Sequence, residues 1–278
     1  MIPLLATLGA MIVVTHAIRP LSGWLGERWG GLLIGLPITT ALTLLYCLWE
    51  RGPQYAAAAA QAGLLGLGAT VAFATATARC LSCSRRLALA VAVGAAAYGV
   101  AALAVAVYMV AALLLRSSEV WLTSLSGLLS LGLIAAGHRT VRGLGGPVSG
   151  RVARRHLSPT WKLLLRTAIP AACLATVLLL AQNAEADLTG LFGTFPCTML
   201  AVLVVTKLEA GPVAAVELLR TYPIGKCSTL AFLAAFALLT PALGPVAGYV
   251  VGYLAAGCVL AGLARTARSV TRAEPALG

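Results

Sequence analysis

Residues 31–56 read GLLIGLPITTALTLLYCLWERGPQYA, and residues 190–215 read GLFGTFPCTMLAVLVVTKLEAGPVAA. The two stretches align without a gap, and identical residues recur in one register. The matches are Gly31/Gly190, Pro37/Pro196, Thr39/Thr198, Glu50/Glu209, Gly52/Gly211 and Pro53/Pro212, continuing to Gly66/Gly225, Thr70/Thr229 and Phe73/Phe232. Apolar composition alone aligns Leu with Leu, but it does not align Pro, Glu, Gly and Pro. The chain therefore contains an internal repeat.

The composition around this repeat is that of a membrane protein. Of the 278 residues, 60% are hydrophobic and only 10% are charged. A soluble globular protein carries about 25% charged residues. A membrane-spanning helix needs about 20 apolar residues, so the length allows about nine spans with short loops. We therefore expect an all-α integral membrane protein without a sizeable soluble domain.

Nine apolar runs are candidate spans. They cover residues 2–18, 30–49, 55–79, 87–115, 119–137, 163–182, 188–207, 213–240 and 245–264. The fourth run is long enough to be tilted, kinked near Gly99 or split in two. No positively charged segment precedes the first run, so we interpret it as a true span rather than a cleavable signal peptide.

The distribution of charge predicts the orientation. Lys and Arg number twenty against eight Asp and Glu, giving a net charge of +12. Cytoplasmic loops of membrane proteins are enriched in Lys and Arg. Placing the basic segment 138–166 inside puts the other Arg clusters inside as well, and the loop with Glu185 and Asp187 outside. The prediction is an N-terminus outside and a C-terminus inside a bacterial cytoplasmic membrane.

Nine spans make the two copies of the repeat run in opposite directions. The predicted divisions are a first membrane repeat, a linking span, a basic cytoplasmic loop, a second repeat and a cytoplasmic tail, over 1–117, 118–137, 138–162, 163–266 and 267–278. Inverted repeats of this kind recur in secondary transporters, because one unit in two orientations supplies two packings of similar energy.

Each copy carries a proline inside its apolar segment, followed by hydroxyl side chains. Proline removes a backbone hydrogen bond, and a freed carbonyl in a membrane needs a polar partner or cavity. We predict substrate-binding positions at the two breaks: Pro37, Thr39, Thr40, Pro196 and Thr198. The alternative is two ordinary proline kinks, with each threonine bonded to its own helix.

Charged side chains suggest a binding site and gates. Lys226 lies far inside its apolar segment, where a lysine is costly unless it faces a cavity or partner; a later start of this span near Pro223 would instead leave it at the interface. Arg220 and Lys226 together would attract an anionic solute, and Arg220 is spaced to pair with Glu217. Glu50 and Glu209 end the repeated segments as candidate gating or coupling groups, or as helix caps.

His16 is either a proton-linked group or a hydrogen-bonded histidine at the membrane interface. Cys80 and Cys83 form one C-x-x-C pair without a second pair, so no metal site is expected. Nucleotide-binding, protease and hydrolase motifs are absent, and we expect neither an enzyme nor a cofactor. No basic stretch is interleaved with aromatic residues, so a nucleic-acid partner is not expected.

The segment Gly190–Ala215, with Phe195-Pro196, Thr198 and a Glu-x-Gly turn, resembles the GlpM-like small bacterial membrane proteins. The first copy is similar but has Leu36 in place of Phe, and Cys197 departs from the usual polar residue after the proline. The resemblance implies a multispanning membrane protein rather than a particular activity.

These features together predict a membrane transporter or exporter of a small anionic or zwitterionic solute, working by alternating access. The alternatives are a non-catalytic membrane component that serves an envelope biosynthesis or transport partner, and a lipid flippase. The expected partners are membrane lipid, the solute, and either a second copy of the chain or another membrane protein.

Overall fold

The computed structural model describes residues 5–13, 34–84, 86–114, 119–144 and 157–273. Within these ranges the chain is helical and contains no strand. The helices are α3 (Ile38–Arg51), α4 (Pro53–Ser84), α5 (Leu87–Leu114), α6 (Glu119–Arg142), α7 (Pro159–Asn183), α8 (Ala186–Gly193), α9 (Cys197–Leu243) and α10 (Pro245–Ala273). The prediction of an all-α protein is confirmed for these residues.

Five helical segments are long and apolar enough to cross a membrane. They are Pro53–Ser84, Leu87–Met109, Pro159–Asn183, Ala186–Leu243 and Pro245–Arg265. Such helices are consistent with a multi-pass membrane protein. The fourth of them joins α8 and α9 and is 58 residues long, far longer than one crossing requires.

The nine predicted runs correspond to fewer candidate spans for identifiable reasons. The runs 188–207 and 213–240 fall in the single joined segment of α8 and α9, and α3 has only 14 residues. The first run is described only over residues 5–13, and α6 is not among the five candidates. The fourth run forms one helix, α5, which continues through Gly99.

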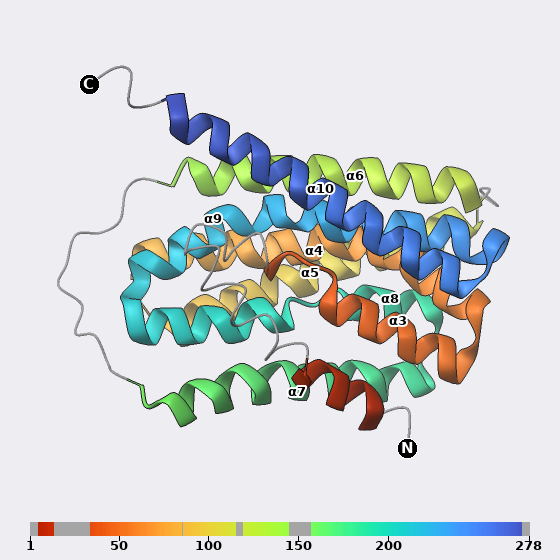
Figure 1. Cartoon of the computed structure of the whole chain (residues 1–278), viewed down its shortest axis with the longest axis horizontal. Helices are drawn as coiled ribbons and strands as arrows, with labels where there is room; N and C mark the ends of the chain where they lie inside the picture. Colours follow the sequence, from red (N-terminus) through yellow and green to blue (C-terminus); the bar gives the residue numbers. More distant parts are fainter. Residues whose placement is uncertain (1–4, 14–33, 85, 115–118, 145–156, 274–278) are drawn as a thin grey trace.

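The helices are layered around α4 (Figure 1). The most apolar window of α4 is 83% buried, whereas those of α5, α7 and α10 are 22%, 22% and 17% buried. The outer helices expose large apolar side chains, such as Val100 and Val246 at 71% and 76%. A water-soluble helix would place polar side chains there, so this exposed apolar surface suits contact with lipid.

The two copies of the sequence repeat share a turn of the same backbone geometry. Gly52 has φ 88° and ψ 176°, and Gly211 has φ 88° and ψ −178°. Only glycine adopts this conformation without steric cost, and the proline that follows each glycine suits the first position of a new helix. In Figure 1, the turn between α3 and α4 lies at the right end of the bundle and the bend within α9 at the left end.

Candidate functional site: two helix breaks crossed by the central helices

Both predicted proline positions interrupt a helix in the same way. Pro37 has φ −77° and ψ 42°, and Pro196 has φ −78° and ψ 55°. On either side of each proline, a backbone N–H donates to the carbonyl two residues earlier, over 2.8 Å in both copies. This is the geometry of a tight three-residue turn. The break before α3 and the break between α8 and α9 are therefore local equivalents.

Each break is held by a helix from the other copy of the repeat. The Thr70 hydroxyl on α4 donates to the carbonyl of Thr194, in the second break, over 2.7 Å. The Thr229 hydroxyl on α9 donates to the carbonyl of Gly35, in the first break, over 2.5 Å. Thr70 aligns with Thr229, and Gly35 aligns with Thr194. The two hydrogen bonds are thus a crossed, matched pair that satisfies carbonyls freed by the breaks.

Close backbone contacts accompany these hydrogen bonds. A Cβ atom added to Gly35 would overlap the backbone of Gly225 on α9. A Cβ atom added to Gly66 on α4 would overlap the Thr194 hydroxyl and lie 3.0 Å from the Leu191 carbonyl oxygen. Small residues permit such approaches between membrane helices. The aligned glycines Gly66 and Gly225 therefore bring each central helix against the break of the opposite copy.

We expect Thr70→Val to lower the free energy of unfolding by about 1 kcal/mol, within the range for hydrogen bonds between membrane helices. Thr229→Val should cost less, because the Ser228 hydroxyl, which donates to the Gly225 carbonyl over 2.7 Å, lies 3.2 Å from the Gly35 carbonyl and can replace the lost donor. The double variant Ser228→Ala/Thr229→Val should lower the free energy of unfolding as much as Thr70→Val does, because it leaves the Gly35 carbonyl without either hydroxyl. Unfolding in mixed micelles measures all three variants. Thr70→Ser, which keeps the hydroxyl, is the control. Equal losses of stability in Thr70→Val and Thr229→Val would contradict the idea that Ser228 can replace Thr229 as donor to the Gly35 carbonyl.

Lys226 is buried beside the first break. Its side chain is only 5% exposed, and its neighbour Gly225 contacts Gly35. Lys226 is therefore buried inside the helical bundle rather than on its surface. Its ammonium lies 5.1 Å from the centroid of the Tyr222 ring, a cation–π contact. Within the described ranges, neither of the ion pairs found involves Lys226.

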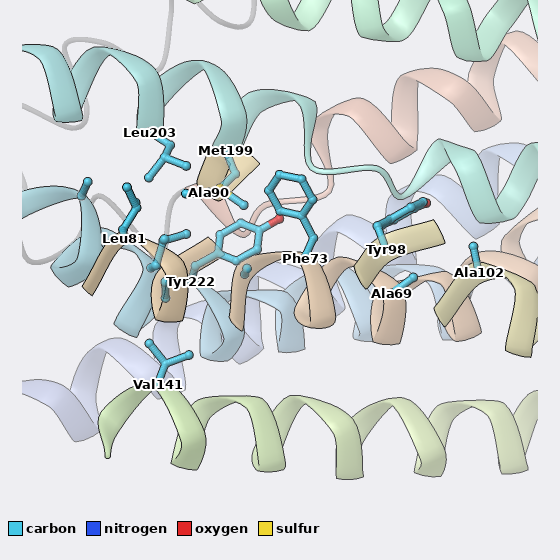
Figure 2. Close-up of a cluster of buried hydrophobic side chains, with 14 of the residues drawn as sticks. Ala69, Phe73, Leu81, Ala90, Tyr98, Ala102, Val141, Met199, Leu203 and Tyr222 are labelled. Atoms are coloured by element: carbon cyan, nitrogen blue, oxygen red, sulfur yellow. The ribbon is translucent and has the colours of Figure 1, made fainter. Parts of the chain in front are cut away.

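Tyr222 is the second buried polar group at this position. It is 0% exposed and belongs to an apolar cluster with Phe73, Tyr98 and Met199, shown in Figure 2. Among the described residues, its hydroxyl has no hydrogen-bond partner. A buried hydroxyl without a partner is unusual, because its loss of hydration is not compensated. Within the described part of the chain, Lys226 and Tyr222 therefore both carry donors without a hydrogen-bond acceptor.

Arg220 does not join Lys226, although both are on α9. Its guanidinium bonds to the Glu217 carboxylate and to the Leu144 carbonyl, over 2.9 and 2.8 Å. The predicted pairing of Arg220 with Glu217 is confirmed. The Arg220 carbonyl also lies 3.3 Å from Nδ1 of His138 on α6. Arg220 thus ties α9 to the end of α6, about 9 Å along the helix axis from Lys226.

Glu50 and Glu209 have different surroundings. Glu50 is exposed, whereas Glu209 forms an ion pair with Lys162 on α7. At the other end of α7, the Arg51 guanidinium donates to the Gln182 carbonyl over 2.9 Å. Helix α7 therefore contacts the chain beside both repeated glutamates.

We expect Glu209→Gln and Lys162→Met each to change the free energy of unfolding by about 1 kcal/mol or less. The two side chains are 26% and 33% exposed, and such ion pairs are screened by solvent. A double-mutant cycle in mixed micelles measures the coupling between them. Glu50→Gln is the matched control in the other copy. A coupling of several kcal/mol would contradict this and make the pair a principal structural contact.

The predicted hydroxyl positions are only partly engaged. The Thr40 hydroxyl donates to the Gly193 carbonyl over 3.2 Å, which links α3 to α8 just before the second break. Thr39 is buried and Thr198 is half-buried. The predicted position His16 lies outside the described residues. The structure therefore brings both breaks, Thr40 and Lys226 together, and leaves Glu50, Glu209 and Glu217 outside this centre.

The chain matches no protein-family model, no curated protein and no solved structure. The sequence interpretation missed Tyr222 and the roles of Gly35, Thr70 and Thr229. Thr70 and Thr229 could have been found, because they are identical across the repeat and follow the breaks at equal spacing. Tyr222 has no such signal, since Gly63 occupies the matching position.

Proposed function

We propose that this chain is a membrane transporter or exporter that moves a small anionic or zwitterionic solute by alternating access. The observation that carries the proposal is the buried Lys226 beside two matched helix breaks. Broken helices near the middle of a bundle expose backbone groups that can bind a solute. A buried lysine without a carboxylate partner among the described residues would attract a negative group.

We further propose that the chain crosses the membrane nine times as two inverted repeats, with residues 118–137 as the link. The support is the matched geometry of the two breaks and the two Gly-Pro turns, together with the opposite ends at which those turns lie (Figure 1). Crossed hydrogen bonds between aligned residues are what a two-fold arrangement would produce. Reporter fusions in the loops 138–162 and 183–187 should report opposite sides of the membrane.

The crossed contacts suggest how two states could form. Rocking of one repeat against the other would open the break on one side while the matched break stayed packed. Because the two contacts use aligned threonines and glycines, the two states would differ little in energy. Alternating access requires this balance, since a strongly preferred state would not cycle.

The test is ligand screening followed by flux. The purified chain is melted with sodium salts of small carboxylates and phosphates, amino acids, sugars and lipid headgroups. A solute that binds only the folded state at 100 times its Kd stabilises it by about 2.7 kcal/mol. Stabilising solutes are then loaded as isotopes into proteoliposomes. Exchange that Pro37→Ala, Pro196→Ala and Lys226→Leu abolish would support transport.

A chain that merely assists another membrane protein would give the opposite result. Lys226→Leu would be tolerated in cells, no solute would stabilise the protein, and changes on an exposed helix face would abolish function. A flippase would translocate fluorescent lipid in the same vesicles without moving water-soluble solutes. Either outcome would remove the solute-transport proposal.

A further inference from the structure

We infer that Lys226 and Tyr222 form one binding centre for a single negatively charged oxygen group, such as a carboxylate or a phosphate monoester carrying one charge. This inference rests on the proposed function and specifies the group that the site recognises. Tyr222 enters it as a hydrogen-bond donor to that group, a role that the repeat does not reveal.

The first support is the count of donors and acceptors. The Lys226 ammonium offers three donors and the Tyr222 hydroxyl offers one. Their shared contact is the face of the Tyr222 ring, which is 5.1 Å from the ammonium nitrogen. A cation over the ring face leaves its N–H groups on the far side uncommitted, and the phenol hydroxyl lies in the ring plane. A group with two acceptor oxygens could receive from both side chains.

The second support is charge. Apolar and aromatic side chains pack around Tyr222, and neither ion pair found among the described residues includes Lys226. An ammonium in such surroundings is costly without a counter-charge. One bound negative charge neutralises it, whereas two would leave an uncompensated charge of the opposite sign. The site should therefore prefer monoanions, and zwitterions through their carboxylate, over dianions such as sulfate or succinate.

The third support is the position of the centre next to the first break. Gly225, which precedes Lys226, contacts Gly35 in the first break, and the Thr229 hydroxyl donates to the Gly35 carbonyl. Any change of this break would shift the backbone that carries Lys226. Binding of an anion to Lys226 is thereby coupled mechanically to the break, as a transport cycle requires.

The experiment uses Tyr222→Phe, which removes only the hydroxyl. Affinities for sodium acetate, sodium L-lactate and sodium L-glutamate are measured by melting at constant ionic strength, with succinate, sulfate and choline for comparison. We expect a monoanion to stabilise the wild-type protein. Tyr222→Phe should weaken monoanion binding about tenfold, which corresponds to the loss of one hydrogen bond to a charged group. Lys226→Met should abolish the binding. Tyr253→Phe on α10 is the matched control and should bind like the wild type.

Three results would overturn the inference. They are unchanged anion binding in Tyr222→Phe, tighter binding of dianions than monoanions, and an internal counter-charge for Lys226. The last is tested with Glu27→Gln, because Glu27 lies outside the described residues; anion affinity that rises in this variant would identify Glu27 as the partner. Flux measurements distinguish the two proposals. Anion binding without flux would contradict the transport proposal alone. Flux of a neutral solute that does not depend on Lys226 would contradict the anion-binding centre alone.

Discussion

Lys226→Met should melt at a higher temperature than the wild-type chain while losing solute binding and flux. The ammonium is 5% exposed and packs against the Tyr222 ring, without an ion pair among the described residues. Met has a similar length and no charge, and replacing a poorly compensated buried charge with an apolar side chain often stabilises a protein by about 1–4 kcal/mol. Thermal melting in detergent and isotope flux in proteoliposomes measure the two effects.

The matched control is Lys207→Met, which removes a half-buried lysine from the first half of the same helix and should change neither property. A second variant, Leu67→Lys, introduces a lysine at the aligned and fully buried position of α4. It should destabilise the chain strongly, because the new ammonium would be buried and α4 carries no carboxylate to neutralise it. A lower melting temperature for Lys226→Met would show that the lysine stabilises the fold and would contradict a role confined to the solute.

Gly35→Ala should produce a large loss of stability for the addition of one methyl group. The new methyl group would overlap the Cα, carbonyl carbon and carbonyl oxygen of Gly225. A flexible side chain could move away, but these are backbone atoms of a central helix. Overpacking costs about 1–3 kcal/mol in cores that relax, and more where they cannot. We expect a loss of about 3 kcal/mol for alanine and failure to fold for leucine, measured by unfolding in mixed micelles and by yield.

Gly99→Ala is the control for this prediction, because no atom from another described helix lies within 4 Å of a Cβ added there on α5. That variant should be neutral or slightly stabilising, since alanine is the better helix former. Comparable losses at both glycines would show that helix propensity rather than the contact with Gly225 decides the result. A double variant with Thr229→Val tests whether contact and hydrogen bond act together at the first break.

Much of the helical content could be predicted from the sequence, because apolar runs in a low-charge chain have few other stable arrangements. The runs 55–79, 87–115 and 245–264 begin within two residues of α4, α5 and α10, although α4 and α10 continue beyond the ends of their runs. The two proline breaks and the Gly-Pro turns were also predictable, since proline and glycine act on the local backbone. The sequence did not decide the number of membrane crossings, because the predicted runs 188–207 and 213–240 lie in one joined helical segment, Ala186–Leu243.

The candidate site was less predictable. Pro37, Pro196 and Lys226 were identified from position alone, and the structure brings them near one another. Arg220 was grouped with Lys226 because both are basic and on one helix. The structure directs Arg220 to Glu217 and the end of α6 instead, a difference that depends on which helix packs against each face.

The sequence by itself determined the helices, the breaks and the repeat, because these depend on local backbone preferences and on the exclusion of charge from an apolar environment. Only the tertiary structure decided that each break packs against the central helix of the opposite copy, and that Lys226 is buried against Tyr222. Such contacts join residues far apart in the chain, through hydrogen bonds between Thr70 and Thr194 and between Thr229 and Gly35. They depend on shape and donor geometry, which no periodicity of one segment encodes.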